Sequence, residues 1–199
     1  MRNKNLLKRL LQIVLLAPAV FIAFEFFAEN QTKEMYDHAL KETGEIGTRL
    51  IIVTLLISPL LLIFKKLKVL KWMAVNKRYF GVASAVYMLL HTLIYVVYLN
   101  FDQIVTDLSQ ATYVFGWLAL LAVLPPLLTS WDSQIKRLGS KTWKRVQQIS
   151  YVCAVFTCLH WAFLGDEIEV VLLHFIPLLV LEIYRIYKTK YKPQHAMSR

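Results

Sequence analysis

The chain lacks most of the signatures of a soluble enzyme or a nucleic-acid-binding protein. It has no G-x-G-x-x-G motif, so it carries no recognisable nicotinamide-binding domain. Its formal net charge is +10, but no basic stripe alternates with stackable aromatic residues on a polar domain, which argues against nucleic-acid binding. Internal repeats and low-complexity tracts are also lacking.

The chain is rich in long hydrophobic runs. Hydrophobic residues make up 57% of its 199 residues, and aromatic residues make up 13%. Each run is long enough to cross a hydrocarbon core of about 30 Å, where only a helix can satisfy the backbone. We therefore expect an all-α protein, a six-helix transmembrane bundle that forms a single domain over residues 1–199. The expected spans are about 10–27, 48–64, 80–98, 113–129, 143–163 and 170–187.

The first run follows several basic residues and resembles a signal peptide. It is too long for a typical apolar signal region, and no clear small-x-small cleavage site follows Phe27. We interpret this run as a retained membrane anchor.

Positive charge is distributed unevenly between the connections of these spans. If the N-terminus is cytoplasmic, 20 of the 23 basic residues fall in inside segments, whereas Lys33, Lys41 and Arg49 fall outside. Cytoplasmic loops carry such an excess of lysine and arginine. We therefore expect both termini in the cytoplasm and a multi-pass protein of the cell inner membrane. Acidic residues of the last two outer connections then form a negative rim, made of Asp102, Asp107, Asp166, Glu167 and Glu169.

Two histidines lie inside apolar runs at what the topology predicts to be similar depth. His91 lies eleven residues after Phe80, where the third run begins, and His160 lies five residues before Gly165. Both runs go from inside to outside, so both imidazoles fall in the outer half of the membrane. A haem iron is the partner that two histidines on facing helices most commonly share. We interpret His91 and His160 as the axial ligands of a haem b.

Other interpretations of the histidines are open at this point. Intramembrane histidines also form hydrogen bonds between helices without any cofactor. A zinc site would require three or four ligands, and no thiolate or carboxylate lies near both histidines. His174 lies in the same outer layer. It could be an interfacial residue that contacts solvent or a haem propionate, and it is also a fallback candidate for a haem ligand.

Cys153 and Cys158 do not indicate a covalently attached haem. The segment Cys158-Leu159-His160 lacks the first cysteine of the C-x-x-C-H signature. Two thiols inside a membrane helix are usually small packing residues, and we interpret them in that way.

Arg49 is the candidate partner for a haem propionate, because it marks the outer mouth of the second run. The alternative is that its side chain reaches the lipid headgroups. No catalytic residue is expected, since two histidine ligands saturate the iron and favour electron transfer over oxygen activation.

An ordered set of short motifs resembles one known family. The motifs are Thr43-Gly44, Thr54-Leu-Leu-Ile-Ser-Pro59, Lys77-Arg-Tyr-Phe-Gly81, Leu90-His91 with Tyr95, Thr129-Ser130, Arg137-Leu-Gly139, Trp143, and Tyr151 followed by His160. Over about residues 40 to 165 they resemble the haem-binding membrane subunits of bacterial methionine-sulfoxide reductase systems, the MsrQ family. That family belongs to the ferric-reductase-like transmembrane group.

The resemblance implies electron transfer from the quinone pool or a reduced flavin to a periplasmic methionine-sulfoxide reductase that contains molybdopterin, for the repair of oxidised proteins. FMN is implied by the family alone. The family has a third histidine thirteen residues before the one that matches His160, where this chain has Gln147. Oxidase relatives carry their other inner ligand at the position of Lys77. This departure from the family pattern predicts about one haem per chain.

Two other functions are compatible with the sequence. A stand-alone ferric or cupric reductase of the same superfamily would pass electrons to a metal ion, and would have no neighbouring periplasmic reductase. A cofactor-free membrane assembly subunit would use its histidines only to join helices, and a visible spectrum distinguishes it from a haem protein.

Overall fold

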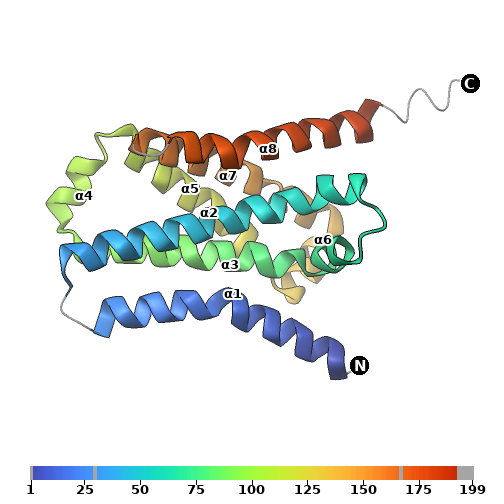
Figure 1. The fold of residues 1–199 in the computed structure, drawn as a ribbon, viewed down its shortest axis with the longest axis horizontal. Helices are drawn as coiled ribbons and strands as arrows, with labels where there is room; N and C mark the ends of the chain where they lie inside the picture. The colour runs from blue at the N-terminus through green and yellow to red at the C-terminus, as the bar shows by residue number, and fades with distance from the viewer. Residues whose placement is uncertain (1, 29–30, 166–167, 192–199) are drawn as a thin grey trace, which may run out of the picture.

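The computed structural model describes residues 2–28, 31–165 and 168–191 of the chain. These residues are helical and contain no strand, which confirms the all-α prediction (Figure 1). The helices are α1 (Arg2–Ala28), α2 (Lys33–Ile63), α3 (Lys68–Tyr98), α4 (Phe101–Asp107), α5 (Ala111–Leu128), α6 (Asp132–Gln147), α7 (Ile149–Leu164) and α8 (Ile168–Ile186), followed by the π-helical turn η1 (Tyr187–Tyr191).

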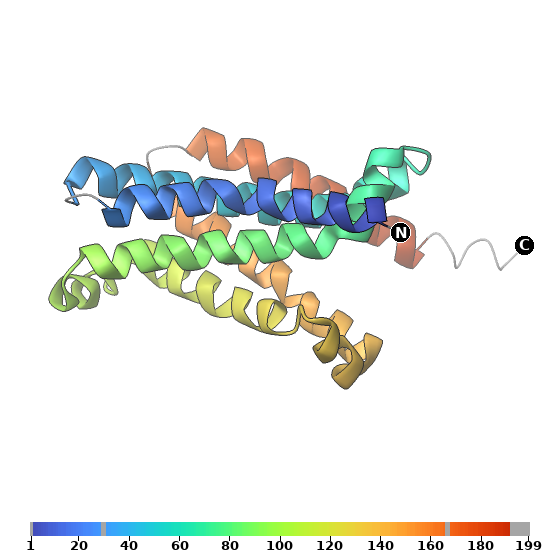
Figure 2. The same cartoon turned by 90° about the horizontal axis from the view of Figure 1, so that it is seen from below.

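The long helices run alongside one another in two closely packed pairs, α2 with α3 and α5 with α7 (Figures 1 and 2). Helix α2 also contacts α7 and α8, and α1 packs against α3 and α2. The start of α1, the turn between α2 and α3, helix α6 and the end of α8 lie at one end of the bundle, whereas α4 lies at the opposite end (Figures 1 and 2).

The core lies where these pairs meet. One buried apolar cluster draws on α2, α3, α5, α7 and α8, and includes Leu55, Ala85, Val123, Cys153 and Leu178. Cys153 is fully buried there as a free thiol, and Cys158 is also free. A second cluster joins α1 to α2 and α3. The four helices α2, α3, α5 and α7 therefore form a packed frame.

The surface of the bundle is unusually apolar. Helices α1 and α8 expose large side chains such as Val14, Phe21, Phe24, Leu173 and Leu179. A soluble monomer rarely exposes contiguous apolar surface of this extent, so these faces fit a lipid environment.

Five helical segments of the described chain are long and apolar enough to cross a membrane: Leu6–Ala28, Lys33–Ile63, Lys68–Tyr98, Ala111–Leu128 and Ile168–Lys190. They overlap five of the six expected spans. Helix α2 begins well before the expected start at Thr48, because Thr32 caps it, its Oγ1 accepting a hydrogen bond from the Met35 amide at 3.3 Å. Apolar runs mark the part of a helix that fits the bilayer and miss its polar ends.

The remaining expected span, 143–163, covers the last turn of α6 and most of α7. The two helices meet at Gln148, whose backbone stays in the α region (φ −68°, ψ −18°). Helix α7 alone has 16 residues, about 24 Å at 1.5 Å per residue, which is short for a span. Upstream, Gly139 (φ 73°, ψ 156°) bends α6, and the left-handed φ favours glycine there.

The segment 100–112, which connects two of the expected spans, contains helix α4. Asn100 caps this helix, its Oδ1 accepting a hydrogen bond from the Gln103 amide at 2.8 Å. Asp107 was expected on a negatively charged rim, and this is wrong, because only 3% of the residue is exposed. Asp102 and Glu169 are exposed, while Asp166 and Glu167 lie outside the described residues.

Candidate functional site

His91 of α3 and His160 of α7 face each other across the frame. Their ring centroids lie 6.2 Å apart and their planes are nearly perpendicular, at 83°. The sequence predicted a similar depth for the two histidines but could not predict that they face each other. Metal–imidazole bonds are about 2 Å long, so two imidazoles on opposite sides of one metal ion place their centroids about 6 Å apart. The observed separation matches this arrangement.

The ring of His91 rests against helix α2. Its Nδ1 lies 3.0 Å from the carbonyl oxygen of Leu40 and 3.3 Å from Oγ1 of Thr43. Thr43 donates its own hydroxyl proton to the Ala39 carbonyl at 2.6 Å, so its oxygen is oriented by α2. Gly44 lets the ring approach, because a Cβ there would lie 3.2 Å from both Cε1 and Nδ1.

The ring of His160 rests against helix α5 in the same way. Its Nδ1 lies 2.7 Å from the Thr112 carbonyl oxygen. The Thr112 hydroxyl donates to the His160 carbonyl oxygen at 3.0 Å, which ties the two helices together. A Cβ on Gly116 would lie 3.0 Å from Nδ1. Each histidine therefore pairs with a carbonyl on the neighbouring helix, and a glycine stands four residues after that carbonyl.

These contacts fix the tautomer of both rings. A carbonyl oxygen only accepts hydrogen bonds, so Nδ1 of each ring carries the proton. In a neutral imidazole the other nitrogen, Nε2, then holds a lone pair and can bind a metal. Histidine ligands of metals commonly donate their second ring nitrogen in this manner, which orients the ring and raises its basicity.

A cavity of about 500 Å³ adjoins both histidines. This volume is in the range of cofactor-binding cavities. Five large aromatic residues line it: Tyr36, Tyr95, Tyr113, Trp117 and Trp161. The remaining lining residues are Asp37, Leu40, Lys41, Gly44, Glu45, Thr48, Met88, His91, Thr92, Gly116, Ala119, Leu120, Thr157, His160 and Leu164.

The donor set fits haem better than a bare metal ion. The described residues contain no group of three or more histidine, cysteine, aspartate or glutamate side chains that could hold a metal. A zinc site needs three or four protein ligands. Two opposed imidazoles beside an aromatic cavity suit an iron whose other four ligands come from a porphyrin.

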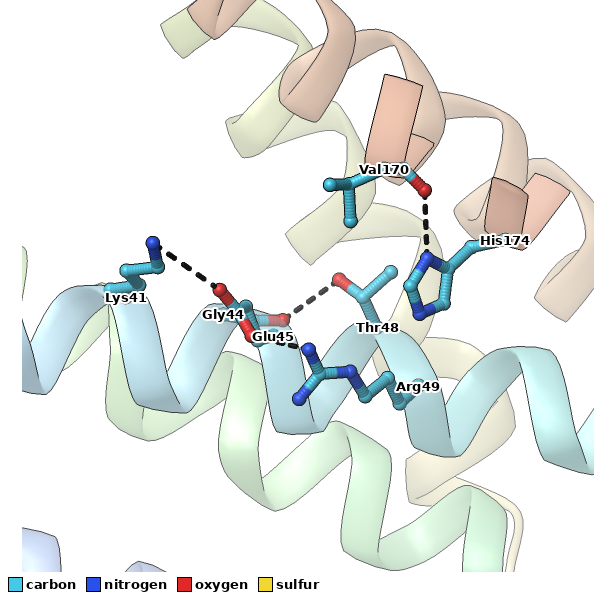
Figure 3. A network of polar contacts seen from close by, with 7 residues as sticks. All are labelled: Lys41, Gly44, Glu45, Thr48, Arg49, Val170 and His174. Atoms are coloured by element: carbon cyan, nitrogen blue, oxygen red, sulfur yellow. Dashed lines mark hydrogen bonds and ion pairs between the residues drawn. The ribbon is translucent and has the colours of Figure 1, made fainter. Parts of the chain in front are cut away.

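Arg49 lies off the cavity. Its guanidinium pairs with Oε2 of Glu45 at 2.5 Å, half of its side chain is exposed (50%), and it is not a lining residue (Figure 3). Lys41, one turn before Glu45, does line the cavity and lies 3.8 Å from Oε1 of Glu45. Lys41 is the one lysine or arginine among the lining residues, and nothing in the sequence signals its place there.

His174 is also set apart from the cavity. Its Nδ1 lies 2.7 Å from the Val170 carbonyl oxygen of its own helix, α8 (Figure 3). Its ring packs against Trp161 at 5.5 Å between centroids, and Trp161 rather than His174 lines the cavity.

The two positions that the family resemblance marks for inner haem ligands, Gln147 and Lys77, have other contacts here. Gln147 donates Nε2 to the Pro126 carbonyl oxygen at 3.0 Å and to Thr129 Oγ1 at 3.1 Å. Lys77 donates Nζ to Ser58 Oγ at 2.9 Å. Both side chains join neighbouring helices.

A model of the family described as ferric reductase like transmembrane component matches residues 43–158. The match covers more than half of the chain and includes His91, and it ends two residues before His160. The chain belongs to this family.

Among curated proteins the chain is similar to the heme-binding subunit MsrQ of protein-methionine-sulfoxide reductase, which confirms the resemblance of its motifs. It is 26% identical to MsrQ of Caulobacter vibrioides over 149 residues, covering 73% of this chain and 69% of that protein. It is 25% identical to MsrQ of Azospira oryzae over 171 residues, covering 84% of this chain and 72% of that protein. It is also 30% identical over 122 residues to the magnetosome protein MamZ of Magnetospirillum gryphiswaldense, covering 59% of this chain and 18% of MamZ. No solved structure matches the chain.

Proposed function

We propose that this chain is a haem b membrane subunit that transfers electrons across the bilayer. The observation that carries the proposal is the pair of imidazoles beside a cavity of about 500 Å³, whose ring centroids lie 6.2 Å apart and whose Nδ1 atoms each lie against a backbone carbonyl oxygen. His91 and His160 would hold the iron, and the aromatic residues that line the cavity would surround the porphyrin. Haem b, when bound, supplies a one-electron couple. Two imidazole ligands leave no position for oxygen.

For the topology we propose six spans with both termini in the cytoplasm, in the cell inner membrane. The charge distribution supports this orientation. The bundle end that holds the α2–α3 turn and α6 carries the basic segments, among them Lys65, Lys66, Lys68, Lys136 and Arg137 (Figures 1 and 2). Lysine and arginine favour the cytoplasmic side. Helices α6 and α7 together would supply the additional span.

We propose a periplasmic methionine-sulfoxide reductase as the electron acceptor, with molybdopterin as its cofactor and a quinone or a reduced flavin, FMN included, as the donor. The names of the MsrQ relatives support the acceptor. The site lies toward the α4 end of α3, since seven residues separate His91 from Tyr98, whereas 23 separate it from Lys68. Electrons would therefore leave near α4.

Stopped-flow reoxidation of the reduced protein tests the acceptor. We expect the reduced haem band to decay faster with an oxidised periplasmic methionine-sulfoxide reductase than with ferric citrate or a cupric chelate at equal concentration. A decay driven only by the metal ions would favour a stand-alone ferric or cupric reductase. A purified protein with no haem band would favour a cofactor-free assembly subunit.

We expect about one haem per chain, since Gln147 and Lys77 bind neighbouring helices. The variant Gln147→His is expected to stay near one haem, because Lys77 still occupies the other inner position. The pyridine haemochromogen assay against total protein measures the ratio. A ratio near two in the unmodified protein would contradict this expectation.

Lys41→Gln is expected to lower haem affinity about two- to fivefold, which corresponds to the free energy that a partly exposed ion pair contributes. The reason is that Lys41 lines the cavity, where a propionate needs a cation. Arg49→Gln, the matched control, removes a cation from the same helix outside the cavity and is expected to change little. The rate of haem transfer to apomyoglobin measures the effect of both variants. A larger effect of Arg49→Gln than of Lys41→Gln would favour Arg49 as the propionate partner, as the sequence predicts.

A further inference from the structure

The α4 end of the cavity is lined by tyrosines, and one of them is tied to a buried acid. Tyr95 lies on α3 one turn beyond His91, and its ring lies 5.8 Å from that of Tyr113. The Tyr95 hydroxyl donates a hydrogen bond to Oδ2 of Asp107 at 2.7 Å. The contact links the cavity wall directly to α4.

Asp107 is the last residue of α4 and is 3% exposed. Its other oxygen, Oδ1, accepts a hydrogen bond from Gln103 Nε2 at 2.9 Å. Burying a carboxylate is costly unless hydrogen bonds compensate it, and these two donors do so. Both donors are uncharged, so they solvate the carboxylate without cancelling its charge. Asp102 on the same helix is exposed.

We propose that Asp107 is a positioning residue that holds Tyr95 against the haem and lowers the midpoint potential of the haem. The proposal rests on the proposed function. Reduction adds one negative charge to the haem, and a carboxylate one tyrosine side chain away from the cavity opposes that change. The effect is strong where the charge is buried, because little water screens it. A lower potential makes the reduced haem a stronger reductant for its acceptor.

Redox titration of the full-length purified protein tests the proposal, with Asp107→Asn compared with Asp102→Asn and Tyr95→Phe. At a fixed ambient potential, Asp107→Asn is expected to raise the ratio of reduced to oxidised haem about tenfold. Asp102→Asn removes the same charge from an exposed position of α4, and is expected to change the ratio by less than about twofold, because solvent and salt screen it. Tyr95→Phe keeps the charge of Asp107 and removes the hydrogen bond to it, so its ratio of reduced to oxidised haem is expected to stay closer to that of the unmodified protein. Because the residue at position 95 is then no longer held by Asp107, haem transfer to apomyoglobin is expected to be faster.

Equal changes in Asp107→Asn and Asp102→Asn would overturn the proposal, and so would an unchanged ratio in Asp107→Asn with haem still bound. Neither outcome would affect the assignment of His91 and His160. An unmodified protein without haem would overturn both the proposed function and this inference. If Asp107→Asn purifies without haem, Asp107→Glu is measured in its place, since it keeps the charge. Its ratio of reduced to oxidised haem must then match that of the unmodified protein, and a tenfold rise would contradict the proposal.

Discussion

His91→Ala and His160→Ala are each expected to remove most of the bound haem. Each substitution deletes an imidazole whose Nε2 would bind the iron. Loss of a metal ligand's outer hydrogen-bond partner alone commonly costs about 10–100-fold in affinity, so loss of the ligand is expected to leave less than about a tenth of the haem. Absorption at the Soret band per purified chain measures the loss.

His174→Ala is the control for this experiment. His174 Nδ1 contacts the Val170 carbonyl oxygen and His174 is not a lining residue of the cavity, so this variant is expected to keep its haem and its low-spin spectrum. Full haem retention in both His91→Ala and His160→Ala would reject the ligand assignment. Loss of haem in His174→Ala with retention in one of the others would promote His174 to a ligand.

Gly116→Ala is expected to lower haem content about tenfold, as other disruptions around a metal ligand do. The added Cβ would stand 3.0 Å from Nδ1 of His160, so the ring must shift by a few tenths of an ångström, which moves it from its present position against the Thr112 carbonyl. Gly44→Ala is expected to have a smaller effect of the same sign, since its Cβ would stand 3.2 Å from the His91 ring.

Gly81→Ala serves as the matched control, because a Cβ there would meet only Thr54 Cγ2 at 3.6 Å, an ordinary contact. Alanine is also the better helix former, so this variant is expected to fold at least as well as the unmodified protein. Haem content and melting temperature, measured together, separate a displaced histidine from a damaged fold. A Gly116→Ala protein with full haem content would show that the ring needs no such close approach.

The sequence located the two histidines, but the features that make them a site come from the fold. Depth along an apolar run follows from counting residues, and this placed His91 and His160 in the same layer. Which way each side chain points depends on how α2 packs on α3 and α5 on α7. The carbonyl and glycine that support each ring lie more than forty residues before it, so local sequence patterns could not pair them, although the Thr43-Gly44 motif was already noticeable.

The choice of a candidate propionate partner depends on position around α2, which the apolar pattern alone does not resolve. The lining positions of α2, among them Lys41, Gly44 and Thr48, repeat with the helical period and so share one face. Arg49 lies four residues after the lining residue Glu45, about 40° further around the helix at the edge of that face, and is not among the lining residues. The run boundary points to this region of the chain, and the lining positions of α2 favour Lys41 over Arg49 as the proposed propionate partner.

Helix α4 was missed because it has seven residues and no apolar run. Its one sequence signal is the cap residue Asn100 followed by Asp102 in the first turn, a pattern that is common in loops as well. The burial of Asp107 depends on Tyr95 of another helix, so composition assigned this acid to the exposed rim when it lies inside.

The absorption spectrum of the purified, unmodified protein, quantified by the pyridine haemochromogen assay, tests the central claim most directly. Two opposed imidazoles predict a low-spin b-type spectrum that does not change when carbon monoxide is added, with about one haem per chain. A protein that carries no haem after expression with sufficient haem supply, or a high-spin spectrum that shifts with carbon monoxide, would contradict the claim that His91 and His160 bind one iron between them.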